Sequence, residues 1–179
     1  MLTVHEIRPE DVQSIGLLHA ASWRAAYRGI LLDEFLDGDL VSNRVAFWER
    51  RLTDHAAFSG GYLATSNNAP AGFTFAFFNA DETWGTLLDN LHVRPDIRRR
   101  GVGRVLLRAL AMRCIEAAGA AGVFLWVYEQ NLPAQRFYDS LGGIRRERQV
   151  VEVRGGGTAA EWRYSWPSAD ALLSAVNDT

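Results

Sequence analysis

The stretch from residue 88 to residue 106 constrains the fold more than any other part of the chain. It reads LDNLHVRPDIRRRGVGRVL: a strand-like segment closed by Pro95, three consecutive arginines, and Gly101-Val102-Gly103 at the start of a helical pattern. The first backbone N–H groups of a helix have no partner within the helix, and the helix dipole adds partial positive charge there. Glycines let a phosphate approach that backbone closely, and arginines add charge and paired donors. This strand–turn–helix unit predicts a site for a diphosphate.

Three other motifs use the same physical logic. A Gly-x4-Gly-Lys-Ser/Thr loop is excluded, because the chain has no lysine and all 19 basic residues are arginine. A dinucleotide fingerprint needs a third glycine or alanine where Leu106 stands, and an acidic residue ending a second strand, where only Glu129 follows. A nucleic-acid patch at 98–100 lacks a helix-turn-helix, zinc or RNA-binding signature, and the isoelectric point near 6.1 does not favour it.

The rest of the chain alternates strand and helix patterns without a repeat or a linker. Helical spacing of apolar residues covers 12–27, 39–52, 101–118 and 131–141. Strand patterns cover 3–7, 62–65, 72–78, 86–93, 123–128, 149–154 and 159–166. This order predicts a mixed α/β (α+β) fold in one domain, residues 1–179, with a central sheet of about seven strands flanked by about four helices.

Composition narrows the class of protein. Hydrophobic residues make up 48% and charged residues 22%, which is typical of globular domains. We expect a cytoplasmic protein, because no apolar run is long enough to cross a membrane and the N-terminus has no signal-peptide pattern. The single cysteine, Cys114, is expected to be structural. The four histidines share no ligand spacing, so no metal site is expected.

The charge is distributed unevenly along the chain. Residues 1–90 carry a net charge of −6, and residues 91–179 carry +4. An anionic ligand near the arginine-rich second half and a cationic one near the first half would fit this field. The acidic run of Asp33, Glu34, Asp37 and Asp39 is either a solvated loop or an attractor for a cationic acceptor.

Three segments resemble one family. Residues 98–103 resemble the Arg/Gln-x-x-Gly-x-Gly/Ala pyrophosphate loop of the GNAT superfamily of acyl-CoA-dependent N-acyltransferases. Residues 131–142 are similar to its Asn-x-x-Ala-x-x-Phe-Tyr-x-x-x-Gly motif, and residues 22–30 resemble the first helix of many bacterial members. The resemblance covers nearly the whole chain. It implies the GNAT fold and transfer of an acetyl group from acetyl-CoA to a primary amine by direct attack.

The resemblance also implies where acetyl-CoA binds. Leu91, His92 and Val93 would offer backbone groups to the pantetheine arm, and the N–H near Leu91 would polarise the thioester carbonyl. Asn131 would contact the same arm while capping its helix. The pyrophosphate would lie against the loop residues Arg98, Arg99, Arg100, Gly101, Val102, Gly103 and Arg104.

Tyr138 matches the family's general acid, which protonates the departing thiolate. Phe137 and Tyr138 are adjacent, so we expect Phe137 to face the core and Tyr138 the cleft. Asp89 is the candidate base, acting through a water, and His92 is its rival. Strand alternation places Asp89 on the same side as Leu91 unless a bulge intervenes.

The acceptor site is the least determined. Trp23 and Tyr27 share one helix face in the region that borders the family's acceptor site, and Trp84 is a second candidate there. The acceptor could be a small-molecule amine, a polyamine, an aminoglycoside or a peptide N-terminus. Acyl length and a homodimer through the strand-rich tail stay open. The alternatives are a non-catalytic acyl-CoA sensor and, less favoured, a nucleic-acid-binding domain.

Overall fold

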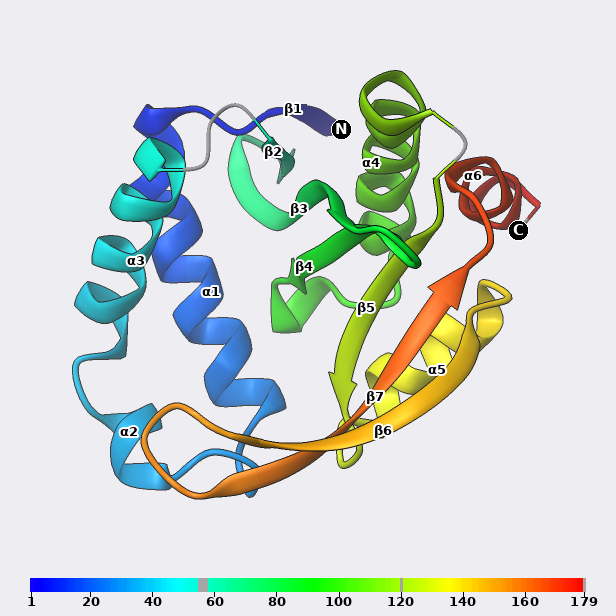
Figure 1. Cartoon of the computed structure of the whole chain (residues 1–179). Helices are drawn as coiled ribbons and strands as arrows, with labels where there is room; N and C mark the ends of the chain where they lie inside the picture. Colours follow the sequence, from blue (N-terminus) through cyan, green and yellow to red (C-terminus); the bar gives the residue numbers. More distant parts are fainter. Residues whose placement is uncertain (55–57, 120, 179) are drawn as a thin grey trace.

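The computed structural model describes residues 1–54, 58–119 and 121–178. Their strands form one seven-stranded sheet in the order β1-β2-β3-β4-β5-β7-β6 (Figure 1). Only β4 and β5 pair in parallel, and all other neighbours are antiparallel. The strands are β1 (Leu2–Glu6), β2 (Ser59–Ser66), β3 (Ala69–Asp81), β4 (Gly85–Val93), β5 (Val123–Tyr128), β6 (Ile144–Glu152) and β7 (Thr158–Trp166).

Six helices are present among the described residues, where about four were predicted. They are α1 (Val12–Ala26), α2 (Asp33–Asp37), α3 (Leu40–Asp54), α4 (Val102–Ala118), α5 (Leu132–Ser140) and α6 (Ala169–Asn177). Figure 1 shows α1 and α3 on one side of the sheet and α4 and α6 on the other. None of these described helices is long and apolar enough to cross a bilayer.

The residues of β3 explain how helices cover both faces. Phe73 and Phe75 are fully buried and pack with Trp48 of α3, with ring centroids 5.3 and 5.2 Å apart. Burying one such side chain contributes about 1.5–3 kcal/mol. On the opposite face Gly72 lies so close to α4 that an added Cβ would stand 3.1 Å from Leu106 Cδ1. Large residues therefore hold the α1–α3 layer, and a missing side chain lets α4 approach.

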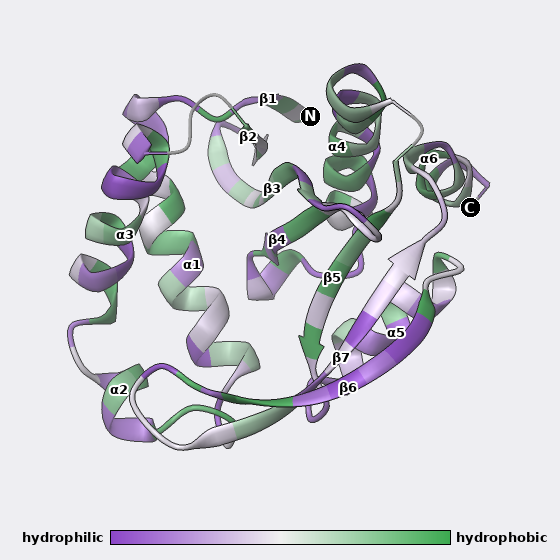
Figure 2. Cartoon of the chain, in the orientation of Figure 1, coloured by the Kyte–Doolittle hydropathy of each residue, from purple (hydrophilic) through white to green (hydrophobic). Residues whose placement is uncertain are grey.

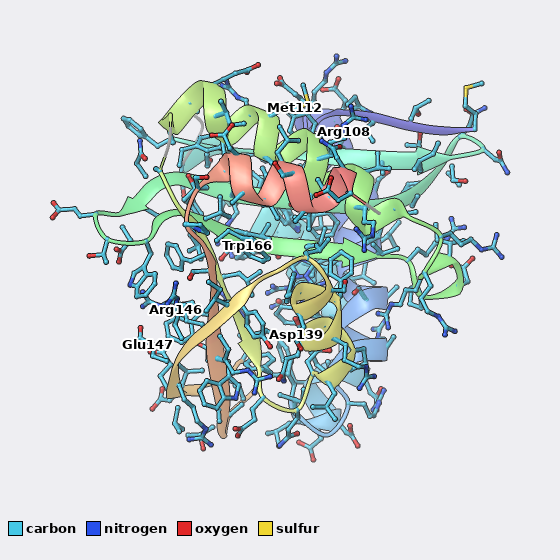
Figure 3. The ribbon with its side chains drawn as sticks, turned by 90° about the vertical axis from the view of Figure 1, so that its right-hand side faces the viewer. Arg108, Met112, Asp139, Arg146, Glu147 and Trp166 are labelled. Carbon is cyan, nitrogen blue, oxygen red and sulfur yellow. The ribbon has the colours of Figure 1, made fainter. Side chains whose placement is uncertain are left out.

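The two helices absent from the prediction have different explanations. α2 has only five residues, too few for a helical period to show. α6 carried a readable signal: Ser168 caps it by accepting the backbone N–H of Ala171 at 3.1 Å, and Leu172 and Val176 are buried one turn apart. Figure 3 shows α6 lying alongside α4, which it covers.

Strand β6 begins at Ile144, five residues earlier than the predicted 149–154. Nearly all of its residues are exposed, so it has no alternation of apolar and polar residues to read. Figure 2 shows most of this edge strand as hydrophilic, with a hydrophobic stretch near its end. Charged edge strands resist pairing with other chains.

The functional feature of the sheet is the way β4 and β5 separate. They pair only at Thr86 with Val123 and Leu87 with Phe124, and no pairing follows. A bulge begins at the same place: Leu88 pairs with Ala76 and Asn90 with Phe75, which leaves Asp89 without a partner in β3. The strands therefore splay toward their carboxyl ends.

Candidate active site

A cavity of about 670 Å³ lies where β4 and β5 diverge. Residues of α1, α3, the start of α4, α5 and the β6–β7 hairpin also line it. Most residues predicted from the sequence for cofactor binding or chemistry are in this lining: Trp23, Tyr27, Asp89, Leu91, His92, Val93, Arg98, Arg99, Gly101, Val102, Gly103, Arg104, Asn131 and Tyr138. One space therefore joins the arginine-rich loop to the candidate catalytic groups.

The start of α4 leaves backbone donors open to a ligand. Gly101 precedes the first turn with a φ of 81° and has no side chain that could cap it. The starts of α5 and α6 differ, because the side chains of Asn131 and Ser168 accept a backbone N–H there. The N–H groups of Val102 and Gly103 lie in the first turn of α4, where the helix offers them no carbonyl to donate to. An anion at this end of the cavity would meet these donors and the positive end of the helix dipole.

The arginines of the loop do not all face the cavity. Arg98 and Arg99 line it, and Arg99 adopts a φ of 62°, which lets the loop turn sharply. Arg100 is exposed and is not part of the lining, so the geometry does not support its prediction as a pyrophosphate contact. Consecutive side chains of a tight turn point in different directions, and the sequence motif does not show which of them face the cavity.

The edge of β4 that faces the gap carries further donors. Arg94 donates its N–H to the carbonyl of Ala71 in β3, and its neighbours pair in register with β3. N–H groups alternate in direction along an antiparallel strand, so those of Leu91 and Val93 point away from β3 toward the gap beside β5. Both residues are therefore placed to hold a ligand along the strand.

Tyr138 is more buried than the sequence predicted. It is 8% exposed and packs in the core, with its ring centroid 5.9 Å from Tyr164 and 6.2 Å from Trp166. Phe137, expected in the core, is only partly buried and packs near Gly103, so the expected division between the two was wrong. The Tyr138 hydroxyl makes no hydrogen bond among the described residues, and the side chain still lines the cavity. Burial raises the pKa of Tyr138, so the phenol keeps its proton.

His92 lies in the core face of β4. Its Nδ1 is 2.9 Å from Ser22 Oγ, and its ring centroid is 4.5 Å from that of His19. Burial, helped by the charge of Arg98, lowers the pKa of His92 to about 3. A ring with so low a pKa is neutral near pH 7 and holds an accepted proton poorly, so this geometry does not favour His92 as the base.

Asp89 lines the cavity at the bulge of β4. The bulge that the sequence argument allowed for does intervene, so simple alternation does not set its direction. The Asp89 Oδ2 atom accepts hydrogen bonds from Arg51 and from the side chain of Asn90. Asp89 is therefore a candidate base, but one of its carboxylate oxygens already accepts hydrogen bonds from Arg51 and Asn90.

Glu161 is a second carboxylate in the cavity, and the sequence argument missed it. It lies on β7 opposite Tyr128, and its Oε1 accepts a hydrogen bond of 2.7 Å from Gln149. Burial raises the pKa of Glu161, which makes it a better proton acceptor than an exposed glutamate. The sequence signal that could have found Glu161 was an acidic residue within a strand whose other residues are mostly apolar or aromatic.

The aromatic pair formed by Trp23 of α1 and Tyr27, which follows that helix, borders the end of the cavity away from the loop. The ring centroids of Trp23 and Tyr27 are 5.6 Å apart, and both residues line the space. The guanidinium of Arg44 lies 4.3 Å from the Trp23 ring centroid. Arg44 therefore already makes the cation–π contact with Trp23 that was expected for a cationic substrate.

Trp84 does not line the cavity. It stands in the turn between β3 and β4, where the guanidinium of Arg163 lies 4.6 Å from its ring centroid. The expected role of Trp84 at the acceptor site is therefore not supported by its position. This turn precedes β4, at the opposite end of that strand from the residues that line the cavity.

The acidic run after α1 also lies outside the lining. Asp33 and Asp37 belong to α2, not to a loop, and both pair with Arg28 at 3.0 and 2.7 Å. All three side chains are at least 46% exposed. These two carboxylates share one guanidinium at the surface and are not part of the cavity lining.

Comparison with known proteins identifies what this arrangement is similar to. Residues 22–142 match the model of the acetyltransferase (GNAT) family. The uncharacterized N-acetyltransferase YuaI of Bacillus subtilis is 28% identical over 181 residues, covering 99% of both chains.

Two solved structures share the fold. The PaiA N-acetyltransferase of Thermoplasma acidophilum, in complex with coenzyme A, superposes with a TM-score of 0.71 at 15% identity, covering 93% of this chain and 99% of that one. The yncA protein of Salmonella typhimurium, with its cofactor acetyl-CoA, gives a TM-score of 0.65 at 18% identity, covering 92% of each chain. These identities are too low to carry more than the fold.

Proposed function

Because the chain belongs to the acetyltransferase (GNAT) family and is an acetyl-CoA-dependent acyltransferase, we propose that it acetylates a primary amine by direct attack on the thioester. The observation that carries this proposal is the single cavity that joins the open start of α4 to Tyr138 and to the splayed strands. A small-molecule amine or a peptide N-terminus would enter from the end bordered by α1 and α3.

The residues present fit acetyl-CoA. The uncapped start of α4 supplies backbone donors and a helix dipole, and Arg98 and Arg99 add charge for the pyrophosphate. The outward N–H groups of Leu91 and Val93 suit the amide-rich pantetheine arm. Asn131 lines the same space while capping α5. Bound acetyl-CoA supplies the activated acyl thioester.

Three groups of this chain then serve the transfer. The N–H of Leu91 donates to the acyl carbonyl oxygen and stabilises the negative charge that develops on it. The amine nitrogen forms a bond to the acyl carbon while the carbon–sulfur bond breaks. Tyr138 donates its proton to the departing sulfur and regains one from solvent. The proton of the incoming ammonium leaves through Asp89 or Glu161, directly or through water.

The experiment that tests this proposal is amine-dependent release of CoA by Tyr138→Phe. The substitution keeps the buried ring and removes only a hydroxyl that makes no hydrogen bond among the described residues, so we expect the protein to fold. We expect kcat to fall about 10²- to 10⁴-fold with acetyl-CoA affinity unchanged, the usual range for a general acid. The matched control is Tyr62→Phe, the same change outside the cavity lining.

A normal kcat in Tyr138→Phe would remove Tyr138 from the chemistry. Acetyl-CoA binding with no transfer to any amine by the wild-type protein would instead favour the acyl-CoA sensor. Comparing acetyl-CoA with longer acyl-CoA donors in the same assay sets the acyl length, which depends on cavity volume.

A further inference from the structure

One face of α3 presents arginines to the cavity. Arg44, Phe47 and Arg51 are spaced three and four residues apart, which puts them on the same side of the helix, and all three line the space. Arg154, in the β6–β7 turn, reaches the same place: its guanidinium lies 5.4 Å from the Phe47 ring centroid. The guanidiniums of Arg44 and Arg51 lie 4.6 and 4.5 Å from it. Three cations therefore surround one aromatic ring.

Arg44 is the most unusual of the three. It is only 2% exposed, and its hydrogen bonds go to the neutral side-chain oxygen of Asn43, at 2.6 and 3.2 Å. No carboxylate pairs with it among the described residues. Burial lowers the pKa of Arg44 to about 10, and the charges of Arg154 and Arg51 act in the same direction. A buried guanidinium without a counter-charge is destabilising unless a ligand supplies one.

The other charges at this end do not balance the cluster. Arg51 pairs with Asp89. Arg154 has no ion pair among the described residues, and Glu161 accepts a hydrogen bond from Gln149, so three guanidiniums stand against two carboxylates, Asp89 and Glu161. The acidic residues of α2 are at the surface, outside the lining. The acceptor end of the cavity is therefore net positive.

Aromatic packing alone does not explain these arginines. The rings of Trp23 and Phe47, 4.3 and 4.6 Å from the Arg44 guanidinium, stabilise a cation but do not neutralise it. An apolar side chain such as methionine would fill the same space without the cost of burying charge. A positively charged residue at position 44 is explained if its guanidinium binds an anionic group of the substrate.

We propose that the amine acceptor carries an oxyanion, a carboxylate or a phosphate, which binds between Arg44, Arg51 and Arg154 while its amine points toward the splayed strands. This inference rests on the proposed function and names the substrate class of the same site. It disfavours the polyamines and aminoglycosides that the chain-wide charge asymmetry suggested, because their positive charges would face three guanidiniums. Planar guanidiniums bind carboxylate and phosphate oxygens in pairs, and a cluster of them selects such groups.

The test uses amines that differ only in the oxyanion. The pairs are leucine with isoamylamine and O-phosphoethanolamine with ethanolamine, and spermidine is the cationic comparison. Each is assayed for acetylation and is also titrated into CoA-saturated protein, so that binding is read without turnover. We expect the oxyanion member of at least one pair to bind and react roughly 10- to 150-fold better than its partner, the range for hydrogen bonds to charged groups. Preference for the carboxylate pair or the phosphate pair identifies the source of the oxyanion.

Variants locate the effect. Arg154→Gln lies at an exposed turn, so folding is not at risk, and Arg44→Gln tests the buried member. Both should raise KM for the preferred oxyanion acceptor at least about tenfold, with acetyl-CoA affinity unchanged. Arg50→Gln is the control, since it removes the same charge from α3 outside the cavity lining.

The outcomes separate the two proposals. Oxyanion-selective binding without any acetyl transfer would uphold this inference and overturn the proposed function. Acetyl transfer to uncharged or cationic amines as fast as to their oxyanion partners, or an unchanged KM in both cavity variants, would overturn this inference and leave the proposed function standing.

Discussion

Replacing Gly101 by glutamate is the sharpest perturbation of the diphosphate site. Gly101 has a φ of 81°, and an added Cβ would meet no atom within 4 Å, so a side chain fits but its backbone is strained. The chain offers a close match in Gly29, which has a φ of 83°, equally open space and a position outside the cavity lining. The two glutamate variants differ mainly in whether the new carboxylate stands where a pyrophosphate would bind.

The magnitudes follow from strain and charge. A non-glycine residue in the left-handed region costs about 1–2 kcal/mol, so both variants should lose that much stability. A carboxylate about 5 Å from a phosphate charge adds repulsion of roughly 1 kcal/mol at the dielectric constant of water and roughly 3 kcal/mol at that of a protein surface. Acetyl-CoA affinity should therefore fall about 5- to 150-fold in Gly101→Glu and stay unchanged in Gly29→Glu.

The assay is isothermal titration with acetyl-CoA and with CoA, beside urea unfolding of the same samples. Equal losses of stability in the two variants would show that strain is matched. If Gly101→Glu then binds acetyl-CoA as tightly as Gly29→Glu, the pyrophosphate is not held at the start of α4, and the argument from the uncapped helix is wrong.

Two further predictions concern titrating groups. Burial lowers the pKa of His92 from its ordinary 6.5 to about 3, so between these values the unfolded chain binds the extra proton. The free energy of unfolding should therefore fall as pH drops below about 6.5, with His92 contributing at most about 1.4 kcal/mol per pH unit. His92→Asn should have a shallower slope in urea unfolding at pH 4–7, and an identical slope would contradict the burial argument. If Glu161 takes the amine proton, Glu161→Gln should lower kcat/KM below pH 8 more than Asp89→Asn does, with less effect at pH 9.5, where more of the amine is already neutral. The opposite ranking in a pH–rate profile would assign the base to Asp89.

The candidate cofactor end of the cavity could be located from the sequence because its residues lie in one segment. Pro95 ends a strand, Gly101 permits a positive φ, and the arginines between them form a short turn, all within a few residues. Tyr138 was placed by a motif of similar length, although its burial was not foreseen. Where the residues of a candidate site lie in one segment, their position at the cavity can be predicted from the sequence.

The acceptor end could not be read in this way, because it is assembled from distant segments. Arg44 looks like an ordinary charged residue on an amphipathic helix, and only its packing against Trp23 and the approach of Arg154 reveal a buried cation cluster. The bulge at Asp89 likewise depends on how β4 pairs with β3, and the residues of β4 alone do not determine that pairing. Net charge by halves of the chain did not show that the acidic residues of α2 lie at the surface, outside the cavity lining.

The measurement that tests the central claim most directly is mass spectrometry of both protein and amine after incubation with isotope-labelled acetyl-CoA. The absence of lysine helps, because no lysine side chain can become acetylated and confuse the protein spectrum. Direct attack predicts labelled N-acetylated amine, one CoA released for each product, and an unchanged protein mass. A labelled acetyl-protein that passes its label to a later-added amine would contradict direct attack, and no labelled amine from any acceptor would contradict the enzyme proposal itself.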